Sequence, residues 1–232
     1  QLLEVIGKND STFPVEAEKI VEDLMYLLKI QDRGRKSLSR PDTPLTNAAL
    51  FTGTPSDLSL EGELKKEIQT ADQIDILCSF IRWSGLRLLL PSLQEATADG
   101  KKLRIITTSY LGATDIKAID ALQKLPNTEL LVSYDTERTR LHAKAWLFRR
   151  RTGFGSAYVG SANLSGAALM GGLEWTLKFT EHGQSDLFNR ALAHFETLWK
   201  DPEFQAYDAR DPRHREALGI ALQRESGDGL IA

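Results

Sequence analysis

Residues 141–148 have the sequence LHAKAWLF, residues 157–169 have AYVGSANLSGAAL, and residues 172–179 have GLEWTLKF. Each segment contains an apolar run typical of a buried strand. Each also carries polar side chains, which are costly to bury unless they are paired or functional. Side chains two positions apart in a strand share a face, so His142 and Lys144 are expected to project together. This stretch therefore predicts the functional site.

The polar side chains of this stretch are an imidazole, an ammonium, hydroxyl and amide donors, and a carboxylate: His142, Lys144, Ser161, Asn163 and Glu174. Such a set suits phosphoryl chemistry without a metal ion. An imidazole nitrogen can attack phosphorus and form a covalent phosphohistidine. The ammonium and the other donors would hold the non-bridging oxygens as charge builds. A carboxylate such as Glu174 would fix the orientation of the imidazole. The sequence predicts cleavage of phosphodiesters.

The pattern H-x-K at residues 142–144, then G-S-x-N at residues 160–163 and Glu174, resembles the signature of the phospholipase D superfamily. The strands and helices before it include SFIRWSG at residues 79–85 and ITTSYLGATD at residues 106–115. This part resembles the phospholipase-D-like nuclease domain attached to certain bacterial superfamily 2 (DEAD/DEAH-box) helicases and defence systems. The wider likeness takes in most of the chain from residue 59 to residue 200.

The resemblance implies a role for each motif residue. His142 would be the nucleophile, Lys144 and Asn163 would bind the phosphate, Ser161 would assist, and Glu174 would orient a histidine. The family's active site brings two such motifs face to face, with one histidine attacking and the other protonating the leaving group. This chain has one motif and no internal repeat, so the resemblance implies a homodimer with the site at the two-fold axis.

The family motif is often written H-x-K-x4-D, and Arg149 occupies the Asp position. We expect this change to add positive charge near the site and to make a lipid-cleaving role less natural. Basic residues bracket the predicted histidine strand at both ends, namely Arg138, Arg140, Arg149, Arg150 and Arg151. Such a cluster would receive a polyanionic backbone. For residues 149–151, a solvated hairpin tip is an equally good interpretation.

Other candidate substrate contacts follow the predicted strands that precede the motif. Arg82 and Trp83 lie just past the end of one strand, where α/β sheets place ligands, and Tyr110 occupies the equivalent place after the next. Trp83 is expected to stack on a base. By contrast, Trp146 and Trp175 lie inside predicted strands and are expected in the core.

The fold class follows from the order of the segments. From residue 60 to residue 134 the chain alternates helix, strand, helix, strand, helix and strand with short connections, which predicts right-handed crossovers. Three strands with short connections then precede a long amphipathic helix at residues 185–200, and one more helix is expected in the tail. We expect an α/β fold with a mixed, largely parallel sheet flanked by helices.

The first 55 residues differ from the rest and are expected to form a helical extension and linker before a domain at residues 56–232. Residues 16–30 carry apolar side chains at helical spacing. Residues 31–47 are polar and basic with two prolines, which is typical of a linker. Basic side chains there would touch nucleic acid or simply remain solvated: Arg33, Arg35, Lys36 and Arg40.

Composition sets further bounds. The 232 residues carry a net charge of -3, so a nucleic-acid role needs a local basic patch. The chain has no apolar run of membrane-spanning length and no signal-peptide pattern at its start, and its single cysteine allows no internal disulfide. These features predict a cytoplasmic protein without membrane attachment. No cofactor is expected, and the four histidines show no zinc-ligand spacing with Cys78.

Taken together, the sequence predicts a metal-independent phosphodiesterase, a DNA nuclease with RNA as the alternative substrate, acting as a homodimer and associated with a helicase domain or subunit. One alternative is a weak or inactive module of a helicase or defence system that binds nucleic acid or dimerises. The other is a phospholipase. A phospholipase requires an exposed apolar or amphipathic segment that faces a membrane, and none is evident in the sequence.

Overall fold

The computed structural model describes residues 40–54, 57–134 and 141–228. The chain divides into two compact units, Gln1–Ser39 and Arg40–Ala232, and the description below concerns the second. The predicted helix at residues 16–30 and the basic residues before Arg40 lie outside the described residues. Arg138 and Arg140 lie outside them as well.

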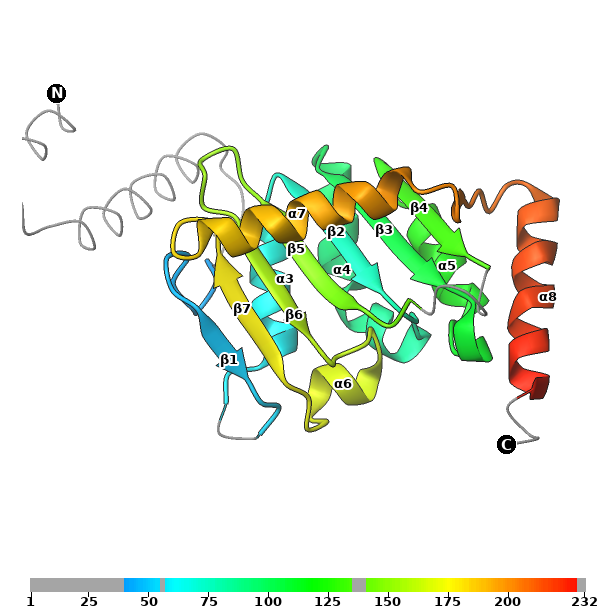
Figure 1. Cartoon of the computed structure of the whole chain (residues 1–232), viewed down its shortest axis with the longest axis horizontal. Coiled ribbons are helices and arrows are strands. Elements are labelled where there is room, and N and C mark those ends of the chain that lie inside the picture. The colour runs from blue at the N-terminus through cyan, green and yellow to red at the C-terminus, as the bar shows by residue number, and fades with distance from the viewer. Residues whose placement is uncertain (1–39, 55–56, 135–140, 229–232) are drawn as a thin grey trace, which may run out of the picture. The chain divides into compact units, whose positions relative to one another are not determined.

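A mixed eight-stranded sheet in the order β1-β7-β6-β5-β2-β3-β4-β8 organises the described residues (Figure 1). Its strands are β1 (Ala49–Phe51), β2 (Gln73–Cys78), β3 (Lys102–Thr108), β4 (Thr128–Ser133), β5 (Lys144–Arg149), β6 (Ser156–Gly160), β7 (Thr176–Thr180) and β8 (Phe204–Ala206). This confirms the predicted mixed sheet flanked by helices.

The share of parallel pairing is smaller than expected. Among the described strands only β2–β3 and β3–β4 pair in parallel, and the remaining neighbours are antiparallel. The reason is the length of the connections, because a parallel neighbour needs a crossover of a dozen or more residues. The connection from β5 to β6, residues 150–155, is too short for a crossover and can only fold back. The connection from β6 to β7, residues 161–175, is longer, but it leads back into an antiparallel neighbour.

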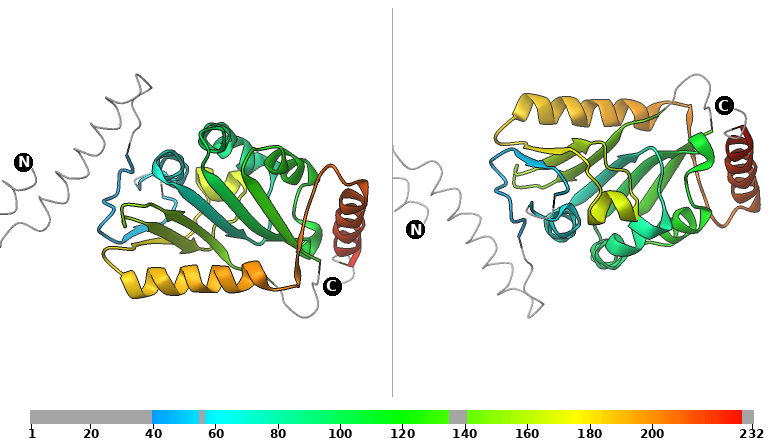
Figure 2. Two further views of the ribbon diagram at one scale, coloured as in Figure 1. Left: turned by 90° about the horizontal axis from the view of Figure 1, so that it is seen from above. Right: turned by 90° about the horizontal axis from the view of Figure 1, so that it is seen from below.

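Helices cover the two faces of the sheet unequally (Figure 2). One face packs against α3, α4, α5 and α6, and the other packs against α7. The helices are α3 (Leu60–Thr70), α4 (Trp83–Ala98), α5 (Ile116–Gln123), α6 (Gly166–Met170), α7 (Ser185–Lys200) and α8 (Pro212–Asp228). In the part of the chain that the structure describes, no helix combines the length and apolar character needed to cross a membrane.

Helix α7 covers only one end of the strands beneath it, and α6 lies at the other end (Figure 1). Phe179 at the end of β7 is buried, together with Phe188 of α7. On the same face, towards α6, four large apolar side chains are exposed: Leu50 (46%), Val159 (41%), Trp175 (68%) and Leu177 (42%). Three of them form one cross-strand row, because Leu177 pairs with both Leu50 and Val159. We call these four residues the apolar strip.

The apolar strip corrects two expectations. Trp146 is buried as predicted, but the prediction that Trp175 lies in the core is wrong, because α7 does not reach that end of β7. An exposed apolar segment, which the sequence did not reveal, is also present. Single exposed apolar side chains are ordinary, but a contiguous group marks an interaction surface.

Buried charges fasten the segment before β1 to the sheet. The Nζ of Lys178 on β7 donates hydrogen bonds to the Thr43 hydroxyl (2.6 Å) and carbonyl (3.2 Å). Glu63 of α3 accepts a hydrogen bond from the backbone N–H of Asp42 at 2.7 Å and from that of Thr43 at 3.0 Å. The compact unit therefore begins near residue 40, and not near residue 56 as the composition indicated.

Candidate active site

The polar motif residues lie at one edge of the sheet. The register pairs Cys78, the last residue of β2, with Lys144, the first of β5. It also pairs Gly160, the last residue of β6, with Thr176, the first of β7. The segments just outside these strand ends therefore meet at the same edge, and they carry His142, Ser161 and Glu174.

His142 and Lys144 form the centre of the site. Lys144 is buried, while His142 is exposed. The Lys144 Nζ lies 3.0 Å from both ring nitrogens of His142 and donates a hydrogen bond to the His142 carbonyl oxygen at 2.7 Å. An ammonium can only donate, so at most one of the two ring nitrogens accepts from it. A nucleophilic imidazole needs the lone pair of such an unprotonated nitrogen.

The environment of Lys144 also tunes its charge. Burial lowers the pKa of Lys144 below the ordinary value for lysine, and the carboxylate of Glu174 opposes part of this shift. A buried ammonium has lost part of its hydration, so it interacts more strongly with an anion that enters the site. Lys144 is therefore well placed to bind a phosphate oxygen beside His142.

Asn163 is held by the segment that follows β2. Its Oδ1 accepts a hydrogen bond from the backbone N–H of Phe80 at 3.4 Å and lies 3.8 Å from the Cys78 Sγ. Both contacts engage Oδ1, so the donor Nδ2 is left for other partners. A second donor, the Asn163 amide, is therefore held near the start of β5, where Lys144 lies.

Ser161 and Glu174 form a separate pair across the ends of β6 and β7. The Ser161 hydroxyl donates a hydrogen bond to Glu174 and accepts one from the backbone N–H of Trp175 at 3.1 Å. The Ser161 backbone N–H donates to the Trp175 carbonyl at 3.0 Å. Glu174 was expected to orient an imidazole. Within the described residues its carboxylate instead accepts a hydrogen bond from Ser161.

The structure corrects the expectation for Arg149 and Arg150. Arg149 ends β5, at the far end of the strand from Lys144. Its guanidinium lies 2.8 Å from the buried carboxylate of Asp75. Arg150 is also occupied, because its Nη2 lies 2.5 Å from the fully buried carboxylate of Glu67. These arginines stabilise the fold and add no positive charge near the site, and Arg150 is not part of a solvated tip.

The remaining predicted contacts lie along the same edge as the motif. Arg82 is exposed, and its backbone N–H donates to the Leu164 carbonyl at 2.8 Å, which places it beside the loop that carries Asn163. Trp83 is half-buried, and the Nζ of Lys117 lies 4.1 Å from the centre of its ring, so one ring face is already covered. Tyr110 is half-buried and follows the end of β3.

Sequence reasoning missed the contribution of Cys78 and Phe80. Cys78 is buried, and burial raises the pKa of its thiol to about 11, so the group is neutral. Yet its sulfur accepts a hydrogen bond from the backbone N–H of Leu164 at 3.3 Å. The only available signal was its place at the end of a strand that points toward the predicted edge.

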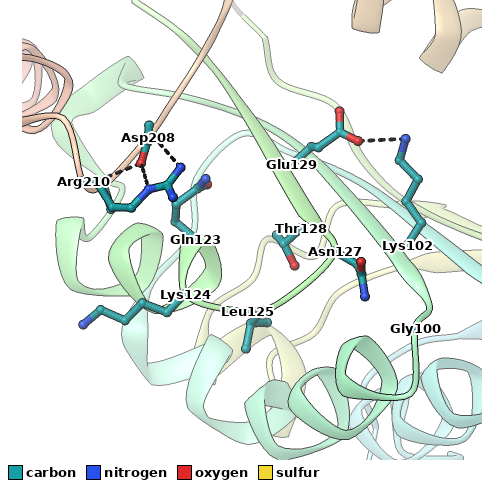
Figure 3. A pocket seen from close by; sticks show the side chains of 11 residues that line it. Gly100, Lys102, Gln123, Lys124, Leu125, Asn127, Thr128, Glu129, Asp208 and Arg210 are labelled. Carbon is teal, nitrogen blue, oxygen red and sulfur yellow. Dashed lines mark hydrogen bonds and ion pairs between the residues drawn. The ribbon is translucent and has the colours of Figure 1, made fainter.

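A pocket of about 680 Å³ lies at the other edge of the sheet, at the start of β3 and β4 (Figure 3). Two of its basic side chains are paired: Lys102 with Glu129 at 2.8 Å, and Arg210 with Asp208 at 2.9 Å. It contains none of the motif residues. The motif residues lie at the opposite ends of the strands.

Comparisons with known proteins concern the fold and the family. No curated protein sequence gives a match. In structure, the chain is similar to the phospholipase D family member Nuc from Salmonella typhimurium, with 18% identity over 70% of this chain and 100% of that chain and a TM-score of 0.53. It is similar to NucT from Helicobacter pylori, with 19% identity over 69% and 99% and a TM-score of 0.50.

A third similar structure is phosphatidylserine synthase from Haemophilus influenzae, with 13% identity, coverage of 95% of this chain and 56% of that chain, and a TM-score of 0.52. At such identities these likenesses concern the fold alone. The sequence itself matches the family model described as "Cardiolipin synthase, PLD-like domain" over residues 64–199. That match covers more than half of the chain and includes every motif residue. The chain therefore belongs to the phospholipase D superfamily.

Proposed function

We propose that the protein is a phosphodiesterase that cleaves DNA without a metal ion, through a covalent phosphohistidine on His142. The observation that carries the proposal is the contact of Lys144 Nζ with the imidazole of His142, 3.0 Å from each ring nitrogen. A nucleophile and a cation for the phosphate are thus held side by side. Asn163 adds a second donor at the same edge.

The reaction has two steps. A ring nitrogen of His142 attacks phosphorus, a P–N bond forms, and the P–O bond to the leaving alkoxide breaks as that oxygen takes a proton. Water then attacks phosphorus and gives its proton to the group that protonated the leaving oxygen, and the P–N bond breaks to return the imidazole. During both steps Lys144 and Asn163 would stabilise the charge on the non-bridging oxygens.

The leaving oxygen needs a proton donor, and within the described residues no second histidine lies at the site. The other histidines lie elsewhere in the described residues: His182 stacks on Phe154, His194 lies within α7, and His214 accepts from the backbone N–H of Asp208. A second copy of the chain would supply its own His142. We therefore propose a homodimer in which each copy completes the site of the other.

The apolar strip supports this dimer, because Trp175 at its end bonds directly to Ser161 of the site. If each side chain of the strip offers at most about 200 Å², the value for an aromatic side chain, the exposed fractions amount to at most roughly 400 Å² in each copy. Two copies would cover at most about 800 Å² of apolar surface, compared with the about 1,000 Å² that a specific interface needs. The polar rim of the site would supply the rest.

The proposed substrate is DNA, with RNA as the alternative. Arg82 is an exposed cation beside the Asn163 loop, and Trp83 and Tyr110 continue along the same edge. Cations and aromatic rings that follow one another in this way suit a nucleic-acid strand. We also propose that the protein associates with a helicase domain or subunit. The alternative is a catalytically weak or inactive module of a helicase or defence system that binds nucleic acid or dimerises.

A phospholipase is the second candidate, and the exposed apolar strip beside the site favours it. A surface of this kind can enter the boundary between headgroups and acyl chains. The two candidates share the chemistry of His142 and differ in what the strip contacts. A second copy of the chain would cover the strip in the nuclease, and lipid would cover it in the phospholipase.

One experiment separates the candidates. The purified chain is incubated in EDTA with single-stranded DNA, double-stranded DNA, RNA or phosphatidylcholine vesicles, and the products are resolved. We expect cleavage of DNA that His142→Ala abolishes and that His182→Ala, a matched change outside the site, leaves intact. Activity on vesicles alone would support the phospholipase. Wild-type protein that cleaves none of the substrates would refute the enzyme and favour the binding module.

A further inference from the structure

The loop that follows β6 is fastened to β2, which is not its neighbour in the sheet. In the strand order β5 lies between β6 and β2. The loop nevertheless reaches the residues that follow β2, because Leu164 pairs in parallel with Ile81 and accepts a hydrogen bond from the Arg82 N–H at 2.8 Å. The loop therefore crosses the end of β5, where Lys144 begins the strand.

Cys78 lies at the centre of this crossing. Its side chain is buried, with an exposed fraction of 1%. The sulfur accepts a hydrogen bond from the Leu164 N–H at 3.3 Å and can donate to the Phe80 carbonyl at 3.2 Å or to Asn163 Oδ1 at 3.8 Å. In the sheet, Cys78 is the register partner of Lys144. The Cys78 side chain thus contacts the loop that carries Asn163, and its strand is paired with the strand of Lys144.

We propose that Cys78 is a positioning residue, which sets the amide of Asn163 at a fixed place relative to the ammonium of Lys144. This inference rests on the proposed function, in which both groups hold the phosphate. Phe80 provides the other fixed point, since its N–H binds Asn163 Oδ1. Cys78 acts through the loop and does not touch the substrate.

Sulfur suits this place because its contacts are long. Hydroxyl hydrogen bonds to oxygen are formed at about 2.5–3.0 Å, whereas the contacts of the Cys78 sulfur range from 3.2 to 3.8 Å. Serine would keep a donor and an acceptor but would reach its partners less well. Alanine would leave the Leu164 N–H without its acceptor, and an unpaired buried N–H is costly.

The test combines Cys78→Ala and Cys78→Ser with a matched control, Ile76→Val. Ile76 precedes Cys78 by two residues on β2 and belongs to the same buried core. We expect Cys78→Ala to lower kcat about tenfold, as expected for one hydrogen bond lost at the site. KM should change less than twofold, because charge on the phosphate oxygens builds mainly in the transition state. The serine variant should recover part of the loss, and the control should match wild type.

A double-mutant cycle separates positioning from a loss of folded protein. If Cys78 acts through Asn163, then Cys78→Ala should have less than a twofold effect on kcat once Asn163→Ala is present. A tenfold effect in both backgrounds would overturn the proposal, and so would equal kcat values for Cys78→Ala, Ile76→Val and wild type. Thermal unfolding of each variant checks that the folded protein is compared.

A readout without turnover distinguishes this inference from the proposed function. The side-chain amide of Asn163, assigned by its absence in Asn163→Ala, is followed by NMR while inorganic phosphate is added. Cys78→Ala should shift this signal in the free protein and weaken its response to phosphate at least threefold. If wild type cleaves nothing, the proposed function fails, and an unchanged amide signal in Cys78→Ala would still refute the positioning role.

Discussion

Glu67 is a carboxylate with no exposed surface, and it lies between two cations. Its Oε2 lies 2.5 Å from Arg150 Nη2, and its Oε1 lies 3.3 Å from Lys178 Nζ. It also accepts a hydrogen bond from the Tyr158 hydroxyl at 2.8 Å. With Glu63, which lies 3.7 Å from Lys178 Nζ, the cluster contains two carboxylates and two cations. Its charges cancel only while both carboxylates are ionised.

We predict that Glu67→Gln lowers the free energy of unfolding by about 3–5 kcal/mol, because it leaves a buried cation without its partner. The amide has nearly the same volume as the carboxylate, so the loss reports charge and not packing. Urea denaturation at neutral pH measures the change. The matched control is Glu129→Gln, whose carboxylate forms an exposed ion pair with Lys102, and it should leave the midpoint unchanged.

The same carboxylate makes the fold sensitive to acid. Burial alone would raise the pKa of Glu67, but the charges of Arg150 and Lys178 outweigh it, and the folded-state pKa lies below the ordinary value. The unfolded chain therefore binds the proton more readily. The contribution of Glu67 is present above the unfolded value of 4.5 and is lost as pH falls through the folded value.

As pH falls from about 5 to about 3, the free energy of unfolding of Glu67→Gln should therefore decrease less than that of wild type. A loss below about 1 kcal/mol at neutral pH would refute the argument for a charge-balanced cluster. An acid response identical in Glu67→Gln and wild type would refute the role of this carboxylate in acid sensitivity.

Three further predictions concern the site. On the alkaline side, kcat/KM should decrease at a pH below about 10.4, the ordinary pKa of lysine. The reason is that burial lowers the pKa of Lys144, whose protonated form binds the phosphate. A decrease only at higher pH would contradict this. Leu177→Asp should convert the dimer to a monomer in light scattering and reduce DNA cleavage more than tenfold, whereas Ile220→Asp, on the exposed side of α8, should do neither. Gly53→Ala should lower the free energy of unfolding by more than the roughly 1 kcal/mol expected for Gly153→Ala. Both glycines have positive φ, but only at Gly53 would the new Cβ lie 2.0 Å from a carbonyl oxygen of the loop before β7. Equal losses in urea denaturation would contradict the collision.

The sequence was sufficient for the elements whose signal is local. Helix α7 was predicted at residues 185–200 and occupies Ser185–Lys200. The buried apolar strands that carry Lys144 and precede Ser161 were also predicted from their residues, and they occupy β5 and β6. In these cases apolar periodicity and strand alternation depend on residues close in the chain, so they can be read without the fold.

Features that depend on distant partners could not be predicted. Strands β1 and β8 have three residues each, too few for a periodic pattern, and they exist because they pair with β7 and β4. Arg150 resembles a surface arginine until its partner Glu67, 83 residues away, is known. The exposure of Trp175 depends on where α7 crosses the sheet, which no residue near Trp175 indicates.

The fastening of the β6 loop to β2 has a consequence for biogenesis. The hydrogen bond between Phe80 and Asn163 spans 83 residues, and contacts of such sequence separation close late, after the entropy of a long loop has been lost. A nascent chain that has reached Lys144 already carries the imidazole and the ammonium, but it has no amide opposite them. In the proposed phosphodiesterase, the phosphate site would therefore be assembled only after Asn163 has been synthesised and its loop has closed onto the segment after β2.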